Sequence, residues 1–116
     1  IAKSPSQEYF GRMVTITTNS LGLRGLEVTY KKPQNVKRIL VLGDSYTFGV
    51  YVENNETYAS VLEKLFEGDA RKVQVINGGY ADGFGPDSHY AWLINEGLKF
   101  EPDIIIYGFF VFRRTF

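Results

Sequence analysis

The chain has 116 residues, of which 44% are hydrophobic and 16% aromatic, so its length predicts one domain, or part of one, with material for a core. Its 13 basic and 13 acidic residues cancel, which argues against nucleic acid or an anionic membrane as the main partner. The absence of cysteine excludes disulfides, thiolate metal sites and a cysteine nucleophile.

Residues 1–35 are interpreted as a lead-in segment that precedes a main domain over residues 36–116. Within the lead-in, Met13–Thr17 and Leu26–Tyr30 both alternate apolar and polar side chains in a way typical of strands. The turn-forming residues of Asn19–Gly25 lie between them. The pattern predicts a small antiparallel hairpin built from these two strands.

The main domain opens with an aliphatic run, Ile39–Leu42, that stops abruptly at Gly43-Asp44-Ser45. Such a run predicts a buried parallel strand that ends in a tight loop. Ligands of open α/β sheets bind at the carboxyl ends of the strands. A serine at this point is therefore a nucleophile, a ligand-binding hydroxyl or a helix cap.

A helix is predicted next, with Asn55 as its cap and Gly68 near its carboxyl end. A second strand, Val73–Ile76, ends at Asn77-Gly78-Gly79, and Pro86 opens a second helix that runs to about Gly97. The apolar faces assigned to the two helices consist of Tyr58, Val61, Leu62, Leu65 and Phe66 for the first, and of Tyr90, Leu93 and Ile94 for the second.

The most apolar run, Ile104–Phe112, is expected to be a third strand. The order strand, helix, strand, helix, strand with right-handed crossovers predicts a three-layer α/β/α fold on a parallel sheet. A strand this apolar requires cover on both faces. We expect either that the chain continues in the natural protein, which we favour, or that a homo-oligomer covers this strand.

Four segments resemble, in order, the SGNH (or GDSL) hydrolase family. Arg38–Gly49 is similar to the first conserved block of that family, and the combination of Val75–Gly79 with Gly83–Asp87 is similar to the second. Pro102–Ile106 resembles the strand that leads into the third block, and Asn19–Gly25 resembles the lead-in of bacterial members. The resemblance implies a flavodoxin-like sheet, of which this chain is the amino-terminal part.

Carried over to this chain, the resemblance implies that Ser45 is the nucleophile and the first N–H donor to the oxyanion. Asp44 is then a supporting loop residue. The second N–H donor maps to Gly83, with Gly79 as the other choice. The implied activity is ester hydrolysis through an acyl-enzyme, on acyl groups of sugars, lipids or small esters, without a metal or organic cofactor.

Two departures from the family are evident. The family places an asparagine just after the last strand, where this chain has Phe110–Arg114, with Arg113 at about that position. A guanidinium is a poor geometric replacement for an amide. The family's base is a histidine three residues after an aspartate near the end of the domain, so it would come from a missing carboxyl-terminal part. His89, the only histidine, lacks that spacing and is interpreted as a surface or packing residue.

Other interpretations stay open. One is a non-catalytic SGNH-like module that binds acyl or carbohydrate ligands. Another is a flavodoxin-like domain that holds phosphate with Ser45 and Thr47, although Asp44 would oppose an anion there. Arg24 is interpreted as a loop arginine, Trp92 as a core or interface residue, and the basic pair Lys37-Arg38 as a solvated strand end. Because the chain begins at Ile1 rather than methionine, we expect that an upstream segment, such as a signal peptide or anchor, was removed. The compartment stays open between the cytoplasm and the periplasm, and an extracytoplasmic or membrane-anchored parent protein is favoured.

Overall fold

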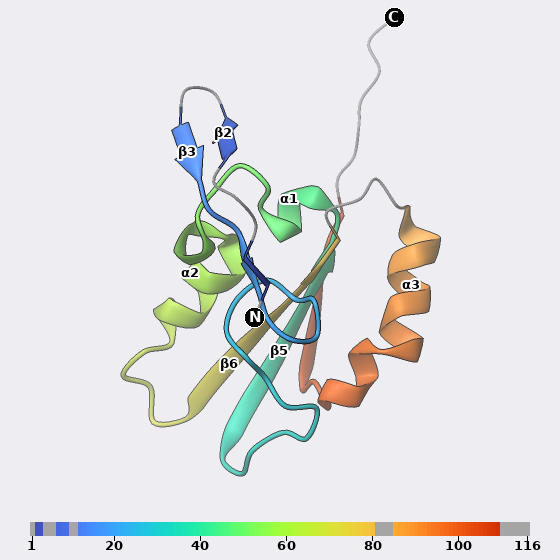
Figure 1. The fold of residues 1–116 in the computed structure, drawn as a ribbon. Coiled ribbons are helices and arrows are strands. Elements are labelled where there is room, and N and C mark those ends of the chain that lie inside the picture. Colours follow the sequence, from blue (N-terminus) through green and yellow to red (C-terminus); the bar gives the residue numbers. More distant parts are fainter. Residues whose placement is uncertain (1, 4–6, 10–11, 81–84, 110–116) are drawn as a thin grey trace, which may run out of the picture.

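A computed structural model describes residues 2–3, 7–9, 12–80 and 85–109. Its centre is a three-stranded parallel sheet in which β5 (Val36–Gly43) lies between β6 (Lys72–Gly79) and β7 (Ile104–Gly108). The chain therefore adds one strand to one side of β5 and the next strand to the other side (Figure 1). The predicted order strand, helix, strand, helix, strand of the main domain is confirmed, although short helical segments that were not predicted lie between these elements. Both β5 and β6 extend beyond the apolar runs that predicted them.

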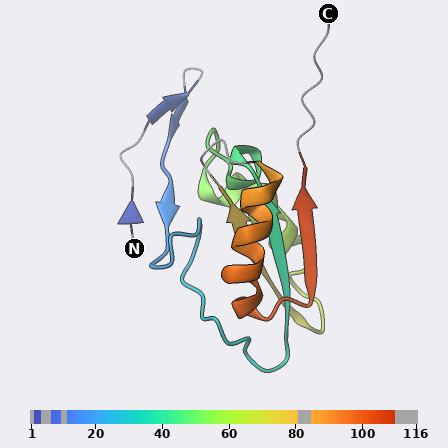
Figure 2. The same ribbon diagram turned by 90° about the vertical axis from the view of Figure 1, so that its right-hand side faces the viewer.

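Alternate side chains of β5 enter two separate cores. Leu40 and Leu42 pack with Phe100 and other residues on the side of helix α3 (Pro86–Asn95). Ile39 and Val41 pack on the opposite side, against helix α2 (Tyr58–Leu65). The two helices cover opposite faces of the sheet (Figures 1 and 2). A strand that is apolar on both faces is what this arrangement requires.

The face that α2 turns to the sheet differs from the predicted one. Ala59 is buried there and Leu62 and Phe66 pack beside it, whereas Val61 and Leu65 are exposed. The small side chain of Ala59 lets the helix lie close to the strands. This close approach determines that the face with Ala59, Leu62 and Phe66, rather than the face with Val61 and Leu65, packs on the sheet.

The cap of α2 is Thr57 rather than the predicted Asn55. The Thr57 hydroxyl accepts a hydrogen bond from Ser60 N at 3.2 Å. Asn55 instead lies inside a preceding 3-10 turn, η1 (Asn54–Glu56). That turn ends before the first residue of α2, so Asn55 is too far from the helix to cap it.

Replacing Thr57 by alanine should lower the free energy of unfolding by about 1 kcal/mol, because Ser60 N loses its acceptor. Asn55→Ala is the matched control and should change it by less than about 0.5 kcal/mol, since Asn55 is exposed. Chemical denaturation of both variants measures the difference. Equal losses would contradict the observed cap.

Helix α3 also presents a different face from the predicted one. Trp92 and Leu93 pack on the core and His89 is buried beneath the helix, while Tyr90 and Ile94 are exposed. The inward positions are thus 89, 92 and 93, and the first of them is a histidine. Because the inward-facing residue at position 89 is a polar histidine, the pattern of apolar residues did not indicate the buried face of α3. Trp92, expected to be a core or interface residue, is partly buried against the core.

The hairpin of the lead-in is built from different strands than predicted. The alternation of residues 13–17 and 26–30 indicated strands but carried no information on their partners, and residues 26–30 form no strand. The pairs are instead made with the first residues of the chain: β3 (Arg12–Val14) with β2 (Gln7–Tyr9), and β4 (Thr17–Thr18) with β1 (Ala2–Lys3). The β2–β3 ribbon stands away from the sheet (Figure 2).

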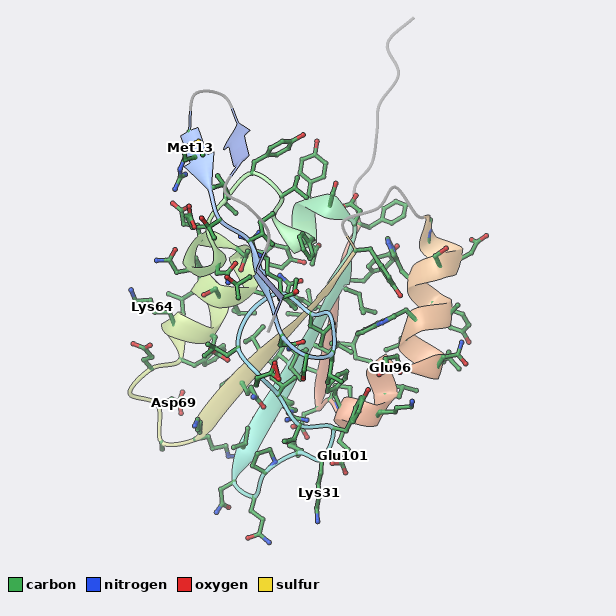
Figure 3. All side chains as sticks on the ribbon, viewed as in Figure 1. Met13, Lys31, Lys64, Asp69, Glu96 and Glu101 are labelled. Atoms are coloured by element: carbon green, nitrogen blue, oxygen red, sulfur yellow. The ribbon has the colours of Figure 1, made fainter. Side chains whose placement is uncertain are left out.

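Arg38 is not the solvated residue that its basic neighbour suggested. Its side chain is only 1% exposed and donates to the carbonyl oxygens of Tyr30 and Phe100 and to Gln74 Oε1. Burial lowers the pKa of Arg38. The guanidinium therefore ties the amino end of the sheet to the segments around it. By contrast, Lys31, Lys64 and Asp69 project outward (Figure 3).

Strand β7 has an exposed, apolar surface. It is shorter than predicted and ends at Gly108; residues 110–112 of the predicted strand lie outside the described residues. Ile104 and Ile105 are 43% and 42% exposed. Within the described part of the chain, β7 pairs only with β5. That a further segment or a second copy covers this strand stays a prediction.

Candidate functional site at the carboxyl edge of the sheet

Three glycines stand side by side at the carboxyl ends of the strands. Gly43 of β5 pairs in register with Gly79 of β6 and with Gly108 of β7. A Cβ on Gly43 would lie 2.0 Å from Thr47 Oγ1, and one on Gly79 would lie 2.4 Å from Phe48 N. This glycine row (Gly43, Gly79 and Gly108) allows the short helix α1 (Ser45–Phe48) to lie directly against the strand ends.

Side chains from three other places hold α1 on the glycine row. The carboxylate of Asp44 caps the helix by accepting a hydrogen bond from Tyr46 N at 2.9 Å. Thr47 is 2% exposed, and its hydroxyl lies 2.8 Å from the Tyr58 hydroxyl of α2. The Asn77 amide of β6 donates to Thr47 O at 3.0 Å. The position of α1 is thereby fixed from both sides.

Ser45 is the first residue of α1 and is partly exposed. Its hydroxyl makes no hydrogen bond to another residue that the structure describes. The interpretation of Ser45 as the helix cap is wrong, because the cap is Asp44. Of the two aliphatic hydroxyls on α1, that of Thr47 is used to hold the helix, and that of Ser45 is left for chemistry.

The structure brings only part of the predicted site together. Gly79 N donates to Asn77 Oδ1 at 2.9 Å, so this N–H already has an acceptor within the protein. Gly83, the first choice for the second oxyanion donor, lies outside the described residues, and so does Arg113. Ser45, Asp44 and Gly79 therefore lie at one edge of the sheet, with Asp44 and Gly79 engaged in holding the loop.

Arg24 holds the loop that follows α1, a role that the sequence did not indicate. The guanidinium is buried and donates to Phe48 O at 3.1 Å, to Gly49 O and to Val52 O. Its Nε donates to Asn54 Oδ1 at 2.7 Å. Burial lowers the pKa of Arg24, and nearby carboxylates oppose that shift.

The only histidine is buried near the same edge. His89 Nδ1 lies 2.8 Å from the Tyr107 hydroxyl, and the Tyr80 ring stacks on the imidazole with 5.8 Å between centroids. His89 Nε2 has no hydrogen-bond partner among the described residues. The expectation of a packing residue agrees with this environment.

Two tyrosine hydroxyls lie within reach of the Asp44 charge. Burial raises the pKa of Tyr58, and the Asp44 charge adds to that rise, while the hydrogen bond with Thr47 opposes it. Burial and the Asp44 charge also raise the pKa of Tyr107. Both hydroxyls therefore stay protonated at neutral pH and can act as hydrogen-bond donors.

A pocket of about 340 Å³ opens beside α1. A second pocket of about 350 Å³ lies along α3 and shares Tyr80 and Trp92 with the first. Ser45 lines neither of them. The residues that line the first pocket, called here the Phe48 pocket, are Thr18, Leu21, Gly22, Leu23, Phe48, Gly78, Gly79, Tyr80 and Trp92.

Among the described residues, no three histidine or acidic side chains gather in a way that could hold a metal ion. In the same part of the chain, no helix has the length and apolar character needed to cross a membrane. Comparison of the chain with models of protein families, with proteins of curated function and with solved structures found no match.

Proposed function

We propose that this chain carries the nucleophile of a serine ester hydrolase of the SGNH type. The observation that supports this most directly is Ser45. It follows the central strand at the carboxyl edge, on a helix that is fastened at several points, and its hydroxyl is not used by any described residue. A serine nucleophile needs such an unused hydroxyl on a rigid support.

The order of the strands adds support. The first strand of the sheet lies at its centre, the second pairs on one side and the third on the other. Flavodoxin-like sheets begin in this order, and their ligands bind where the order reverses. Ser45 follows the strand at this point of reversal, so a flavodoxin-like parent fold would place it at the ligand site.

In the proposed reaction, Ser45 Oγ attacks the carbonyl carbon of an ester while a base takes the hydroxyl proton. The alcohol leaves with a proton and the acyl group stays on Ser45, until water releases the acid and restores the serine. Ser45 N and the N–H of Gly83 would donate to the oxyanion. Helix α1 has four residues, so its dipole contributes little.

In this proposal the base is a histidine other than His89. His89 is bonded to Tyr107 and buried, and it is the only histidine of the chain. The proposal therefore requires an Asp-x-x-His pair in a carboxyl-terminal part of the parent protein. The chain by itself should show little or no turnover.

In the full-length protein, Ser45→Ala should abolish ester hydrolysis, with a loss of roughly a thousandfold or more, because the nucleophile is removed. A fluorophosphonate should label the unsubstituted protein and not this variant. Ser60→Ala, on α2, is the matched control and should leave labelling unchanged. Labelling of Ser45→Ala at the original rate would overturn the assignment.

A non-catalytic module that binds acyl or carbohydrate ligands is the second candidate. It is favoured because the only histidine of the chain, His89, is hydrogen-bonded to Tyr107 rather than to Ser45, and because Arg113 stands in place of the family's asparagine. Ligand binding by the full-length protein without any fluorophosphonate labelling would support it. Phosphate binding has less support, because the Thr47 hydroxyl is buried against Tyr58 and Asp44 carries a negative charge nearby.

A further inference from the structure

The Phe48 pocket begins one helical turn away from Ser45. Phe48 is three residues after Ser45, and residues at this spacing lie on the same side of a helix. Phe48 also lines the pocket. A molecule that reached Ser45 along this side of α1 would therefore meet the pocket next.

The side chains that line the pocket are uncharged and mostly apolar. Leu21 and Leu23 come from the lead-in turn, Phe48 from α1 and Trp92 from α3, and no described residue that lines the pocket is charged. Its volume of about 340 Å³ is at the small end of the range of ligand pockets. Such a size suits a short alkyl chain or a single aromatic ring.

Two glycines of β6 set the positions of two walls of the pocket. A Cβ on Gly78 would lie 2.9 Å from Trp92 Cζ3, so a side chain there would collide with the tryptophan ring. Gly78 and Gly79 together leave this part of β6 without side chains. The two glycines therefore let Trp92 and Phe48, which both line the pocket, lie close to β6.

The wall formed by the lead-in turn is fixed before any ligand arrives. Asn19 is 3% exposed, and its Oδ1 accepts hydrogen bonds from Leu21 N and Leu23 N, both at 3.0 Å. Asn19 Nδ2 donates to Leu26 O at 3.0 Å. A wall held in this way loses little conformational entropy when a ligand binds.

We infer that the Phe48 pocket binds a short apolar group, and that in the parent protein this is the acyl group of the ester. The second half of this statement rests on the proposed function. The inference thereby names, as the substrate class, esters whose acyl group is a short alkyl chain longer than acetyl or a single aromatic ring.

Trp92 provides the test, because it is the only tryptophan of the chain and lines the pocket. Titration of the full chain with butanol, hexanol and octanol should change its fluorescence to saturation. The affinity should rise about three- to fourfold for each added methylene, as expected for burial of apolar surface. A signal that does not saturate, or an affinity independent of chain length, would overturn the inference.

Two leucine variants locate the site. Leu21→Arg places a charge at the rim of the pocket and should weaken octanol binding at least about fivefold. Leu26→Arg is the matched control, since Leu26 is 87% exposed and does not line the pocket, and it should bind as before. Equal affinities for the two variants would place the alcohol elsewhere, for example in the neighbouring pocket along α3, and the inference would be wrong.

Ser45→Ala separates this inference from the proposed function, because it should leave octanol binding unchanged. Saturable binding without fluorophosphonate labelling of Ser45 would support the pocket and contradict the hydrolase. Labelling of Ser45 without alcohol binding would leave the hydrolase in place and contradict the pocket.

Discussion

Gly79→Ala is expected to lower the free energy of unfolding by about 3 kcal/mol and to displace α1. The new Cβ would lie 2.4 Å from Phe48 N and 2.8 Å from Thr47 C, and these backbone atoms cannot move aside by changing a rotamer. Either α1 moves off the glycine row, or the carboxyl ends of the strands separate. Chemical denaturation measures the loss, and the amide resonances of α1 report the displacement.

Gly85→Ala is the matched control. No heavy atom lies within 4 Å of the position a Cβ would take on Gly85, and its φ of −87° is open to any residue. The control should cost less than about 1 kcal/mol. The comparison also tests the role of Gly79. Alanine keeps the backbone N–H, so a residue needed only as an oxyanion donor would tolerate the change, and Gly79→Ala would be as stable as Gly85→Ala.

The central sheet could be predicted from the sequence because its strands carry a strong signal. A parallel strand that is covered on both faces must be apolar at successive positions, and the run from Ile39 to Leu42 has this character. The glycines and prolines between the apolar runs then marked the turns. Element type and order follow from such signals, and the order in turn predicted a parallel sheet.

The partners of the lead-in strands and the buried faces of the helices could not be predicted. Alternation indicates a strand, but Met13 alternates in the same way whether its partner is an earlier or a later segment. In α2, five apolar positions cover more of the helix than the sheet can bury, and the close approach at Ala59 decides which of them face inward. Strand partners and buried helix faces depend on how closely the elements approach one another, and the periodicity of a single segment carries no information on that distance.

At the candidate site, the motif predicted the place of Ser45 and the supporting role of Asp44, whose cap is now visible. It did not predict that Thr47, Tyr58 and Asn77 fasten the helix. One signal was available, since all three strands end at a glycine. Glycines at equivalent strand ends indicate that something lies close against that edge, and here it is the backbone of α1.

Arg24→Met is expected to lower the free energy of unfolding by about 4 kcal/mol. Methionine fills much of the same space but donates nothing, so the carbonyl oxygens of Phe48, Gly49 and Val52 lose a donor. The guanidinium also lies 5.6 Å from the centroid of the Phe48 ring, and that contact is lost as well. Urea denaturation measures the change.

Arg12→Met is the matched control, because Arg12 makes an ion pair with Glu56 in which both side chains are well exposed. Exposed pairs contribute little, so this variant should lose only about 0.5 kcal/mol.

The two variants should also differ in hydrogen exchange. The N–H groups of Gly49 and Val50 donate to Ser45 O, and their protection should fall in Arg24→Met alone, since only that variant frees the loop after α1. Faster exchange at these amides in Arg24→Met would mean that Arg24 helps to hold the backbone that carries Ser45. Unchanged protection would show that the glycine row, with Thr47, holds α1 without it.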